Sequence, residues 1–391
     1  MPDLYLDNAA TTPLHPQALE AMMPFLTENY ANPSSVYRAA QKVRKAIDES
    51  RLCVAAAISA SPDEIFFTAG GTESDNWAIK GTLEASRPKG HIITSSIEHH
   101  GILHVCKHLE KQGYDVTYLP VDDMGVVSPE SVEEAIRPDT CVVSVMLANN
   151  EVGSIQPLAE ISEITKKHSI PLHTDAVQAV GHIPTDVNDL GVDMLSLSGH
   201  KFYGPKGVGA LYVRKGTRLS QLFHGGAQER NRRAGTENVP GIIGMGAALS
   251  IAMEEMKTET PRLTKLRDRL IDEIIKTIPY CRLNGPRQNR LPSNVNMSFR
   301  FIEGEALLLH LDMHDCQAST GSACSAISLE PSHVLMAMGL SHELTNGAVR
   351  FTLGRSNTDE DIDRLLGILQ TSVEKIRSLS PLYDDFLKTK A

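Results

Sequence analysis

Between residues 64 and 213 the chain alternates between short apolar runs and stretches of helical periodicity. Apolar runs of this length are typical of buried strands, and they occupy 64–68, 91–94, 115–119, 141–147, 170–174, 192–197 and 210–213. Helical periodicity separates most of them, starting at about residue 74 and again over 101–112, 129–136 and 158–168. Repeated strand–helix units of this length predict an α/β fold, in which a mostly parallel central sheet is covered by helices on both faces.

The segments on either side of this region extend the first domain, and from about residue 260 onward they predict a second, smaller one. A short strand at 4–6 precedes helices over 17–28 and 36–58, and two long helices follow the central region at 240–256 and 260–278. Farther on there are strands at 294–299 and 348–353 and helices at 304–313, 331–338 and 358–377. With 391 residues the chain is long enough for two cores. We expect a large domain over residues 15–259 and a smaller α+β domain formed by residues 1–14 and 260–391.

Charge and cysteine usage exclude several classes of function. The net charge of −10 leaves no basic stripe to neutralise phosphates, so we expect no nucleic-acid partner. No apolar run approaches the length of a membrane span, and the N-terminus carries no basic-then-apolar signal segment. The cysteines, at 53, 106, 141, 281, 316 and 324, form no CxxC pair. This spacing argues against a disulfide scaffold or a structural zinc site and favours a reducing cytoplasm.

Polar residues gather at or just after the ends of the predicted strands. They come from separate loops: Gly70, Gly71, Thr72, His99, Asn150, Asp175, Gln178, Ser198, His200 and Lys201. Because ligands bind at the carboxyl edge of an open α/β sheet, these side chains predict one ligand site at that edge. A set that brings hydroxyl, amide, carboxylate, imidazole and amine groups to one edge is hard to produce by chance.

Lys201 is the candidate reactive amine. It lies between two predicted strands, within a run over 196–213 whose glycines and proline require tight backbone bends. A lysine at the end of a buried strand loses hydration, which lowers its pKa and frees the amine to condense with an aldehyde. Taken alone, a lysine in a polar turn is more often a surface residue. The other polar side chains predicted at the same edge favour the reactive role.

A phosphate-binding helix start, an amine, a carboxylate and a stacking ring together fit pyridoxal phosphate (PLP). The strand at 64–68 leads through Gly70-Gly71-Thr72 into a helix, whose free N–H groups and dipole attract an anion. Asp175 would keep the pyridine nitrogen of the cofactor protonated, and His99 would stack on the ring. Each feature has an alternative: a plain strand–helix connection, an N-cap for the following helix, and a buried histidine bonded to backbone.

Nearly the whole chain resembles the cysteine desulfurases of the NifS/IscS-like group, in the fold-type I, class-V aminotransferase family of PLP enzymes. Motifs in the order of that family carry the resemblance, at 5–13, 32–35, 72–76, 98–99, 149–153, 175–178, 198–207 and 321–324, together with Arg350. Departures are few: Tyr37 stands where relatives often carry histidine, and Ala31 where glycine is common. Neither position bears on the core chemistry. The segment around Cys324 resembles the longer-loop group, which favours sulfur delivery.

The resemblance implies roles at the cofactor. Lys201 would bind the cofactor aldehyde covalently. Asp175 would contact the pyridine nitrogen and Gln178 the ring hydroxyl, while His99 would stack on the ring and move protons. A set of backbone and side-chain donors would hold the phosphate: Gly71, Thr72, Ser198 and His200, with Thr236 reaching across from the partner subunit of a homodimer.

The resemblance also implies roles at the substrate, L-cysteine, which would lie near Asn150 with its carboxylate on Arg350. A bidentate guanidinium suits a carboxylate, and Arg355 is an alternative that spacing leaves open. Cys324 would be the nucleophile, because an exposed thiol among small residues can take the substrate sulfur as a persulfide and carry it to an acceptor. No resident metal is implied, and whether Cys324 ligates a transient iron–sulfur cluster stays open.

These roles imply a cysteine desulfurase that converts L-cysteine to L-alanine and supplies sulfur to an iron–sulfur scaffold or another acceptor protein. Two alternatives are open. A different fold-type I enzyme, an aminotransferase or β-lyase, would need Lys201 but not Cys324. A binding module for scaffold proteins would need no catalysis, and the presence of a complete catalytic set argues against it.

Overall fold

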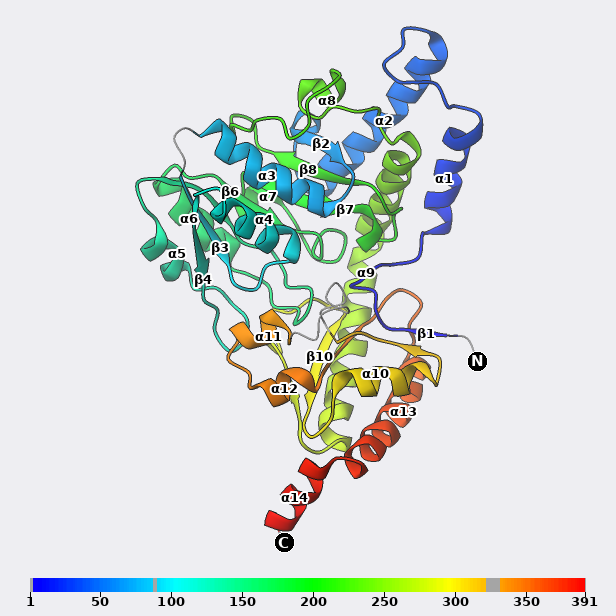
Figure 1. The fold of residues 1–391 in the computed structure, drawn as a ribbon. Coiled ribbons are helices and arrows are strands. Elements are labelled where there is room, and N and C mark those ends of the chain that lie inside the picture. Colours follow the sequence, from blue (N-terminus) through cyan, green and yellow to red (C-terminus); the bar gives the residue numbers. More distant parts are fainter. Residues whose placement is uncertain (1–2, 87–89, 321–330, 391) are drawn as a thin grey trace.

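The computed structural model describes residues 3–86, 90–320 and 331–390, which form two lobes (Figure 1). The larger lobe holds a seven-stranded sheet and the smaller one a three-stranded sheet. One long helix, α9 (Val239–Thr277), runs from the first lobe into the second. The predicted α/β class, a mostly parallel sheet with helices on both faces and a smaller α+β unit, is confirmed.

The strands of the large sheet lie in the order β2-β8-β7-β6-β5-β3-β4. Neighbours from β7 to β4 are parallel, whereas β8 is antiparallel to both β2 and β7. The strands are β2 (Ile65–Thr68), β3 (His91–Ser95), β4 (Asp115–Leu119), β5 (Thr140–Ser144), β6 (Leu172–Asp175), β7 (Met194–Ser198) and β8 (Gly209–Val213). The parallel strands end at one edge, and the predicted ligand site depends on that arrangement.

Helices bury both faces of this sheet. Because successive residues of a strand point to opposite faces, Val143 and Leu195 pack on one side while their neighbours Val142 and Met194 pack on the other. The first face carries α1 (Pro16–Thr27), α2 (Arg38–Ala57), α5 (Pro129–Ala135), α6 (Leu158–Lys167), α7 (Val187–Leu190) and the start of α9. The second carries α3 (Gly71–Ala85) and α4 (His100–Glu110).

The smaller lobe has its own core around an antiparallel sheet in the order β12-β10-β9. These strands are β9 (Cys281–Leu283), β10 (Asn294–Phe299) and β12 (Ala348–Thr352). The helices are α10 (Gly304–Asp312), α11 (His333–Ala337), α12 (His342–Asn346), α13 (Asp359–Ser378) and α14 (Pro381–Lys390). β1 (Leu4–Tyr5) pairs in parallel with β11 (Cys316–Gln317), so the N-terminal segment belongs to this lobe.

α9 is one helix where the sequence predicts two, at 240–256 and 260–278. Pro261 lies inside it and removes one N–H donor, but apolar packing on both sides carries the helix across that position. Ile242 packs in the core of the larger lobe and Leu270 in the core of the smaller one. The predicted division between residues 259 and 260 therefore falls inside a continuous helix, and it stays a prediction.

Other differences from the predicted elements lie in short segments. α3 begins at Gly71 rather than near residue 74, because the glycines that the sequence assigns to a loop open the helix itself. The sequence does not predict β9, β11, α7, α12, α14 or the short turns η1 (Pro62–Glu64), η2 (Gly199–Lys201) and α8 (Gln228–Asn231). Apart from α14, which has ten residues, these elements have two to five residues and show too few repeats for a period to be recognised.

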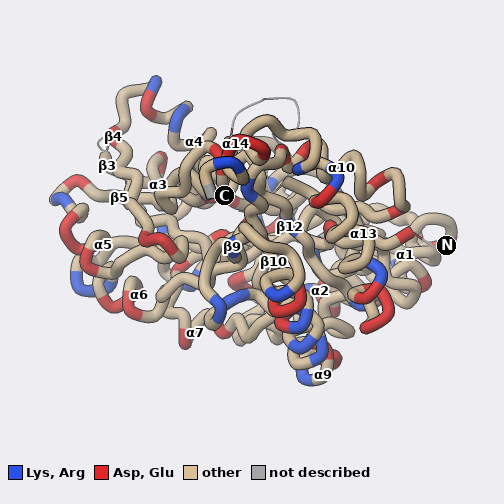
Figure 2. Tube along the Cα trace, turned by 90° about the horizontal axis from the view of Figure 1, so that it is seen from below, with Lys and Arg blue, Asp and Glu red and all other residues tan. Residues whose placement is uncertain are grey.

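By length and composition alone, α9 is apolar enough to cross a membrane, contrary to the expectation that no run approaches that length. In the structure 56% of its apolar window is buried inside the protein. α9 packs against α1 and α2 in the core of the larger lobe. This packing accounts for its apolar character. Acidic and basic residues are interspersed along α9, as the view from below shows (Figure 2).

Candidate active site

A cavity of about 320 Å³ opens where the parallel strands end. Its wall contains ten of the sequence-predicted site residues: Gly71, Thr72, His99, Asn150, Asp175, Gln178, Ser198, His200, Lys201 and Arg350. Thr236 lines a separate cavity of about 120 Å³, between β2 and the start of α9. Cys324 lies outside the described residues. One site therefore collects side chains from segments more than 270 residues apart in the sequence.

Lys201 lies in η2, the turn that follows β7. Its Nζ donates hydrogen bonds to the carbonyl oxygens of Ala9 and Ala10, at 2.6 and 2.8 Å. Ring nitrogen Nε2 of His182 lies 2.9 Å from the Lys201 carbonyl oxygen and fixes the backbone of the turn. The N-terminal loop, which the sequence predicts to be polar but gives no role, therefore holds the amine at the cavity.

Asp175 is the last residue of β6, and it lines the cavity. Burial raises its pKa, while a hydrogen bond from the backbone N–H of Val177, at 2.9 Å, and the charge of Lys201 act in the opposite direction. The alternative of an N-cap does not apply, because residues 177–182 form turns and no helix follows β6 there. A cation facing Asp175, such as a protonated ring nitrogen, would stabilise the ionised carboxylate further.

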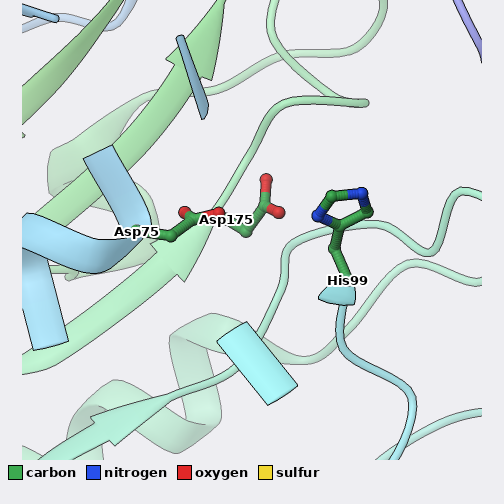
Figure 3. Close-up of side chains that lie close together, drawn as sticks. All are labelled: Asp75, His99 and Asp175. Carbon is green, nitrogen blue, oxygen red and sulfur yellow. The ribbon is translucent and has the colours of Figure 1, made fainter. Parts of the chain in front are cut away.

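His99 combines a structural and a potential chemical role. It is the N-cap of α4, and its Nδ1 accepts a hydrogen bond from the N–H of Gly101 at 3.1 Å. Burial, together with the positive charge of Lys201, lowers the pKa of His99 to about 4, so the ring is neutral at neutral pH. Because Nδ1 is the acceptor, the ring proton resides on Nε2. The ring is turned toward Asp175 (Figure 3).

The start of α3 forms the part of the wall that suits an anion. α3 has 15 residues, and its unpaired first N–H groups follow the N-cap Gly70. A Cβ at Gly71 would lie 2.7 Å from Cγ2 of Val177, so only glycine leaves this approach open. Ser198 and Thr72 line the same part of the cavity. Burial beside Lys201 lowers the pKa of His200 to about 4, which leaves His200 neutral as well.

Arg350 and Arg355 lie in different surroundings. Arg350, in β12, is 2% exposed and lines the cavity, where its Nη2 donates to Oδ1 of Asp7 and its Nη1 to the carbonyl oxygen of Asn150. Arg355 pairs with Glu255 at 3.0 Å and stacks over the ring of Tyr203, at a different small cavity. Sequence spacing left both arginines open as the partner of a substrate carboxylate, and Arg350 is the one that lines this cavity.

Sequence reasoning gave no role to Asp75, although it lies at the cavity. One ligand atom from each of Asp75, His99 and Asp175 lies within 4.8 Å of the others (Figure 3). The available signal was helical spacing, because Asp75 follows Thr72 by three residues and therefore shares its helix face. Two carboxyls and an imidazole resemble a metal-ligand set, but the ammonium of Lys201 at the same cavity opposes a divalent cation.

Comparison with known proteins shows which family has this fold. The family model described as "Aminotransferase class-V" matches residues 4–365. The chain belongs to the class-V aminotransferase family. This member of the family is 57% identical, over 380 residues, to a cysteine desulfurase IscS from Methanosarcina thermophila, a match that covers 97% of this chain and 94% of the relative.

Two solved structures are similar to this class-V aminotransferase in sequence and fold. A NifS-like protein is 39% identical, has a TM-score of 0.90, and is matched over 95% of this chain and 99% of that one. A structure described as SspA in complex with cysteine is 40% identical with a TM-score of 0.79, over 90% and 98% of the two chains. The predicted membership of the NifS/IscS-like cysteine desulfurase group is confirmed. This family of enzymes depends on PLP.

Proposed function

We propose that this protein is a PLP-dependent cysteine desulfurase that converts L-cysteine to L-alanine and passes the sulfur on as a persulfide of Cys324. The observation that carries the proposal is the gathering of Lys201, Asp175 and His99 in one cavity at the ends of the parallel strands. The identity to proteins named cysteine desulfurase IscS supports the substrate and the reaction class. Iron–sulfur scaffolds or other sulfur-accepting proteins would receive the product sulfur.

The wall of the cavity fits PLP group by group. The N–H groups at the start of α3, with Thr72, Ser198 and His200, would hold its phosphate, and the Gly71 position leaves space for close approach. Asp175 would face the ring nitrogen and Gln178 the ring hydroxyl. Nζ of Lys201 would bind the aldehyde, and the imidazole of His99 would cover the ring face.

When bound, PLP supplies an electron sink for the carbanion that forms at the substrate Cα. Nζ of Lys201 would accept the Cα proton. The neutral ring of His99 would donate a hydrogen bond from Nε2, and it would transfer a proton only after taking up a second one, because its lowered pKa keeps it neutral in the working range. Asn150 and Arg350 would orient the substrate, with the guanidinium of Arg350 on its carboxylate.

Sulfur transfer would take place on Cys324. The thiolate of Cys324 attacks the substrate Sγ, so that a new S–S bond forms while the substrate Cβ–Sγ bond breaks. The electron pair of the broken bond stays on carbon, which then takes up a proton to give alanine. The persulfide keeps the transferred sulfur and needs no external oxidant at this step.

A homodimer in a reducing cytoplasm would complete the proposal. Thr236 would reach the phosphate of the partner subunit from the polar loop over 224–238. A group of large apolar side chains on and after α1 is exposed in the single chain, as a dimer interface requires: Leu19, Met23, Leu26, Tyr30, Val36 and Tyr37. No resident metal is part of the proposal, and neither nucleic acid nor membrane is a proposed partner.

Product analysis of the PLP-loaded protein with L-cysteine tests the proposal. We expect wild type to yield alanine and a protein persulfide, and Cys324→Ser to yield neither while it retains PLP. Cys141→Ser, at a half-buried cysteine away from the cavity, is the matched control and should behave as wild type. Pyruvate formed equally by wild type and Cys324→Ser would instead identify a β-lyase. Failure of wild type to bind PLP would overturn the assignment of Lys201 and the other cavity residues to a PLP site.

A further inference from the structure

Asp75 is a buried carboxyl to which the proposed reaction gives no role. It lies in α3 with its side chain 1% exposed, and within the described structure its Oδ1 has no hydrogen-bond partner. Figure 3 shows its carboxyl directed toward that of Asp175. A buried carboxylate with an oxygen left unpaired is destabilising, so the group requires either a nearby cation or a proton.

Histidine does not supply the cation. Among the described residues, His173 is the basic side chain within ion-pair distance of Asp75, with Nε2 at 3.8 Å from Oδ1. Both of its ring nitrogens already contact serine hydroxyls, Nδ1 that of Ser144 at 2.9 Å and Nε2 that of Ser196 at 3.0 Å. Burial lowers the pKa of His173 to about 3, so its ring is neutral.

The remaining neighbours favour a charge on Asp175 rather than on Asp75. Asp175 accepts a hydrogen bond from the N–H of Val177 and is stabilised by the charge of Lys201. Asp75 has one stabilising hydrogen bond, with Ser196, and faces two further acids, Asp175 and Glu98. Burial and the charge of Asp175 both raise the pKa of Asp75 well above its usual range. Two ionised carboxylates this close in a buried site repel each other, and the better solvated one keeps the charge.

We propose that Asp75 stays protonated and forms a coupled acid pair with Asp175, in which Asp175 alone carries the negative charge. Asp75 is then a positioning residue that acts through Asp175. The pair presents one negative charge, rather than two, to whatever cation faces Asp175. This role at the ring nitrogen of PLP rests on the proposed function, whereas the protonation of Asp75 is a property of the cofactor-free protein.

Other titratable groups act on the pair from each element packed around it. His99 faces it from the start of α4, Lys201 from η2 and His173 from β6 itself. Glu98, just before α4, is also buried. Its Oε1 accepts hydrogen bonds from Ser95 and Met146, its Oε2 has no partner in the described structure, and burial raises its pKa to about 8. Glu98 is therefore a second protonated acid that any experiment must separate from Asp75.

Infrared spectroscopy of the cofactor-free protein detects the proton directly. At neutral pH we expect a carbonyl-stretch band of a protonated carboxylic acid that shifts on labelling with ¹³C-aspartate and disappears in Asp75→Asn. Glu98→Gln, the matched control, should leave that band in place. The labelled wild type alone shows whether any aspartate is protonated, and the comparison with Asp75→Asn assigns the band to Asp75. The absence of an aspartate-sensitive band would show that both carboxyls are ionised and would overturn the proposal.

Stability gives a second readout in the cofactor-free protein. An acid whose folded pKa is raised binds more protons when folded, so wild type loses stability as pH rises above the unfolded value of about 3.9. Asp75→Asn lacks this loss. Its melting temperature relative to wild type should therefore rise with pH between about 4 and 7. A constant difference across this range would contradict a proton on Asp75.

PLP affinity separates the proposed proton on Asp75 from the proposed cofactor role of Asp175. Since Asn mimics a protonated Asp, Asp75→Asn should bind PLP within about twofold of wild type, whereas Asp175→Asn should bind at least about tenfold more weakly. Equal weakening in the two variants would make Asp75 itself the charged partner and would overturn the acid pair as assigned. Normal binding of PLP by Asp175→Asn would instead refute the cofactor role of Asp175. The infrared result would still decide whether Asp75 is protonated.

Discussion

Nη2 of Arg350 donates a hydrogen bond to Oδ1 of Asp7 at 2.7 Å, across a sequence separation of 343 residues. The pair joins β12 to the N-terminal loop that also supplies the carbonyl oxygens bound by Lys201. Arg350 is therefore held at the cavity by a carboxylate before any substrate is present. A substrate carboxylate would meet a guanidinium that is already oriented, although it must compete with Asp7 for the charge.

Arg350→Lys should raise KM for L-cysteine by about tenfold or more, with a smaller change in kcat. A lysine keeps the charge but cannot form two parallel hydrogen bonds to a carboxylate. Steady-state alanine production measures both constants. Arg355→Lys is the matched control, since that guanidinium pairs with Glu255 at a different cavity, and it should change KM by less than about twofold. The reverse ranking of the two variants would make Arg355 the carboxylate partner.

Lys201→Ala should abolish alanine production and leave PLP removable by simple dialysis. The lost amine is both the covalent anchor and the base for the Cα proton, so added PLP should not restore turnover. Lys206→Ala, at an exposed lysine of the same segment, is the control and should retain the rate of wild type. Turnover by Lys201→Ala within about tenfold of wild type would show that another group removes the proton.

The depressed pKa of His99 predicts acid sensitivity of the cofactor-free fold. The pKa of His99 is about 4 in the folded protein and about 6.5 in the unfolded chain, so between these values the unfolded chain binds more protons. Stability is therefore fully present above about pH 6.5 and is lost as pH falls toward 4. His99→Gln should flatten part of this slope in chemical unfolding measured at several pH values. An unchanged slope would place the acid sensitivity on other histidines with a lowered pKa, such as His173 and His200.

The polar strand ends could be predicted from the sequence, because each strand–helix boundary is a local pattern and parallel strands share one carboxyl edge. That reasoning brought Lys201, Asp175 and His99 to one place without any knowledge of distances. It could not separate Arg350 from Arg355, because β12 and the loop after it are adjacent in sequence but face different cavities. Only the packed structure distinguishes the two.

Asp75 illustrates a second limit. Its position on a helix could be predicted, but its importance depends on burial and on an Oδ1 that has no hydrogen-bond partner among the described residues. It depends also on the proximity of Asp175, which comes from a strand about 100 residues away. The continuity of α9 was missed for a related reason. Pro261 is a local signal for a helix end, whereas the two cores that keep the helix continuous are formed by distant segments.

A buried ion pair holds the segment that leads to Thr236. Nη1 and Nη2 of Arg51 each donate to a carboxylate oxygen of Glu229 at 2.7 Å, and Glu229 also accepts from the N–H of Phe67. Glu229, Arg230 and Asn231 all have positive φ, between 45° and 59°, and the first two are residues that rarely adopt this left-handed conformation. Such a turn costs on the order of 1–2 kcal/mol per residue, so the ion pair must offset the strain.

Arg51→Met should lower the free energy of unfolding by about 3–5 kcal/mol, because it leaves the Glu229 carboxylate buried without its counter-ion. Arg51→Met with Glu229→Gln should recover about half of that loss, since the amide can still accept from Phe67 without carrying a charge. Lys45→Met is the control: it breaks an exposed pair with Glu49 on the same helix and should cost less than about 1 kcal/mol. Because the relaxed turn also releases the loop with Thr236, the single variant should bind PLP more weakly than the control. If the double variant is no more stable than Arg51→Met, the charge of Glu229 is not the source of the loss, and the strained turn is held by its backbone contacts instead.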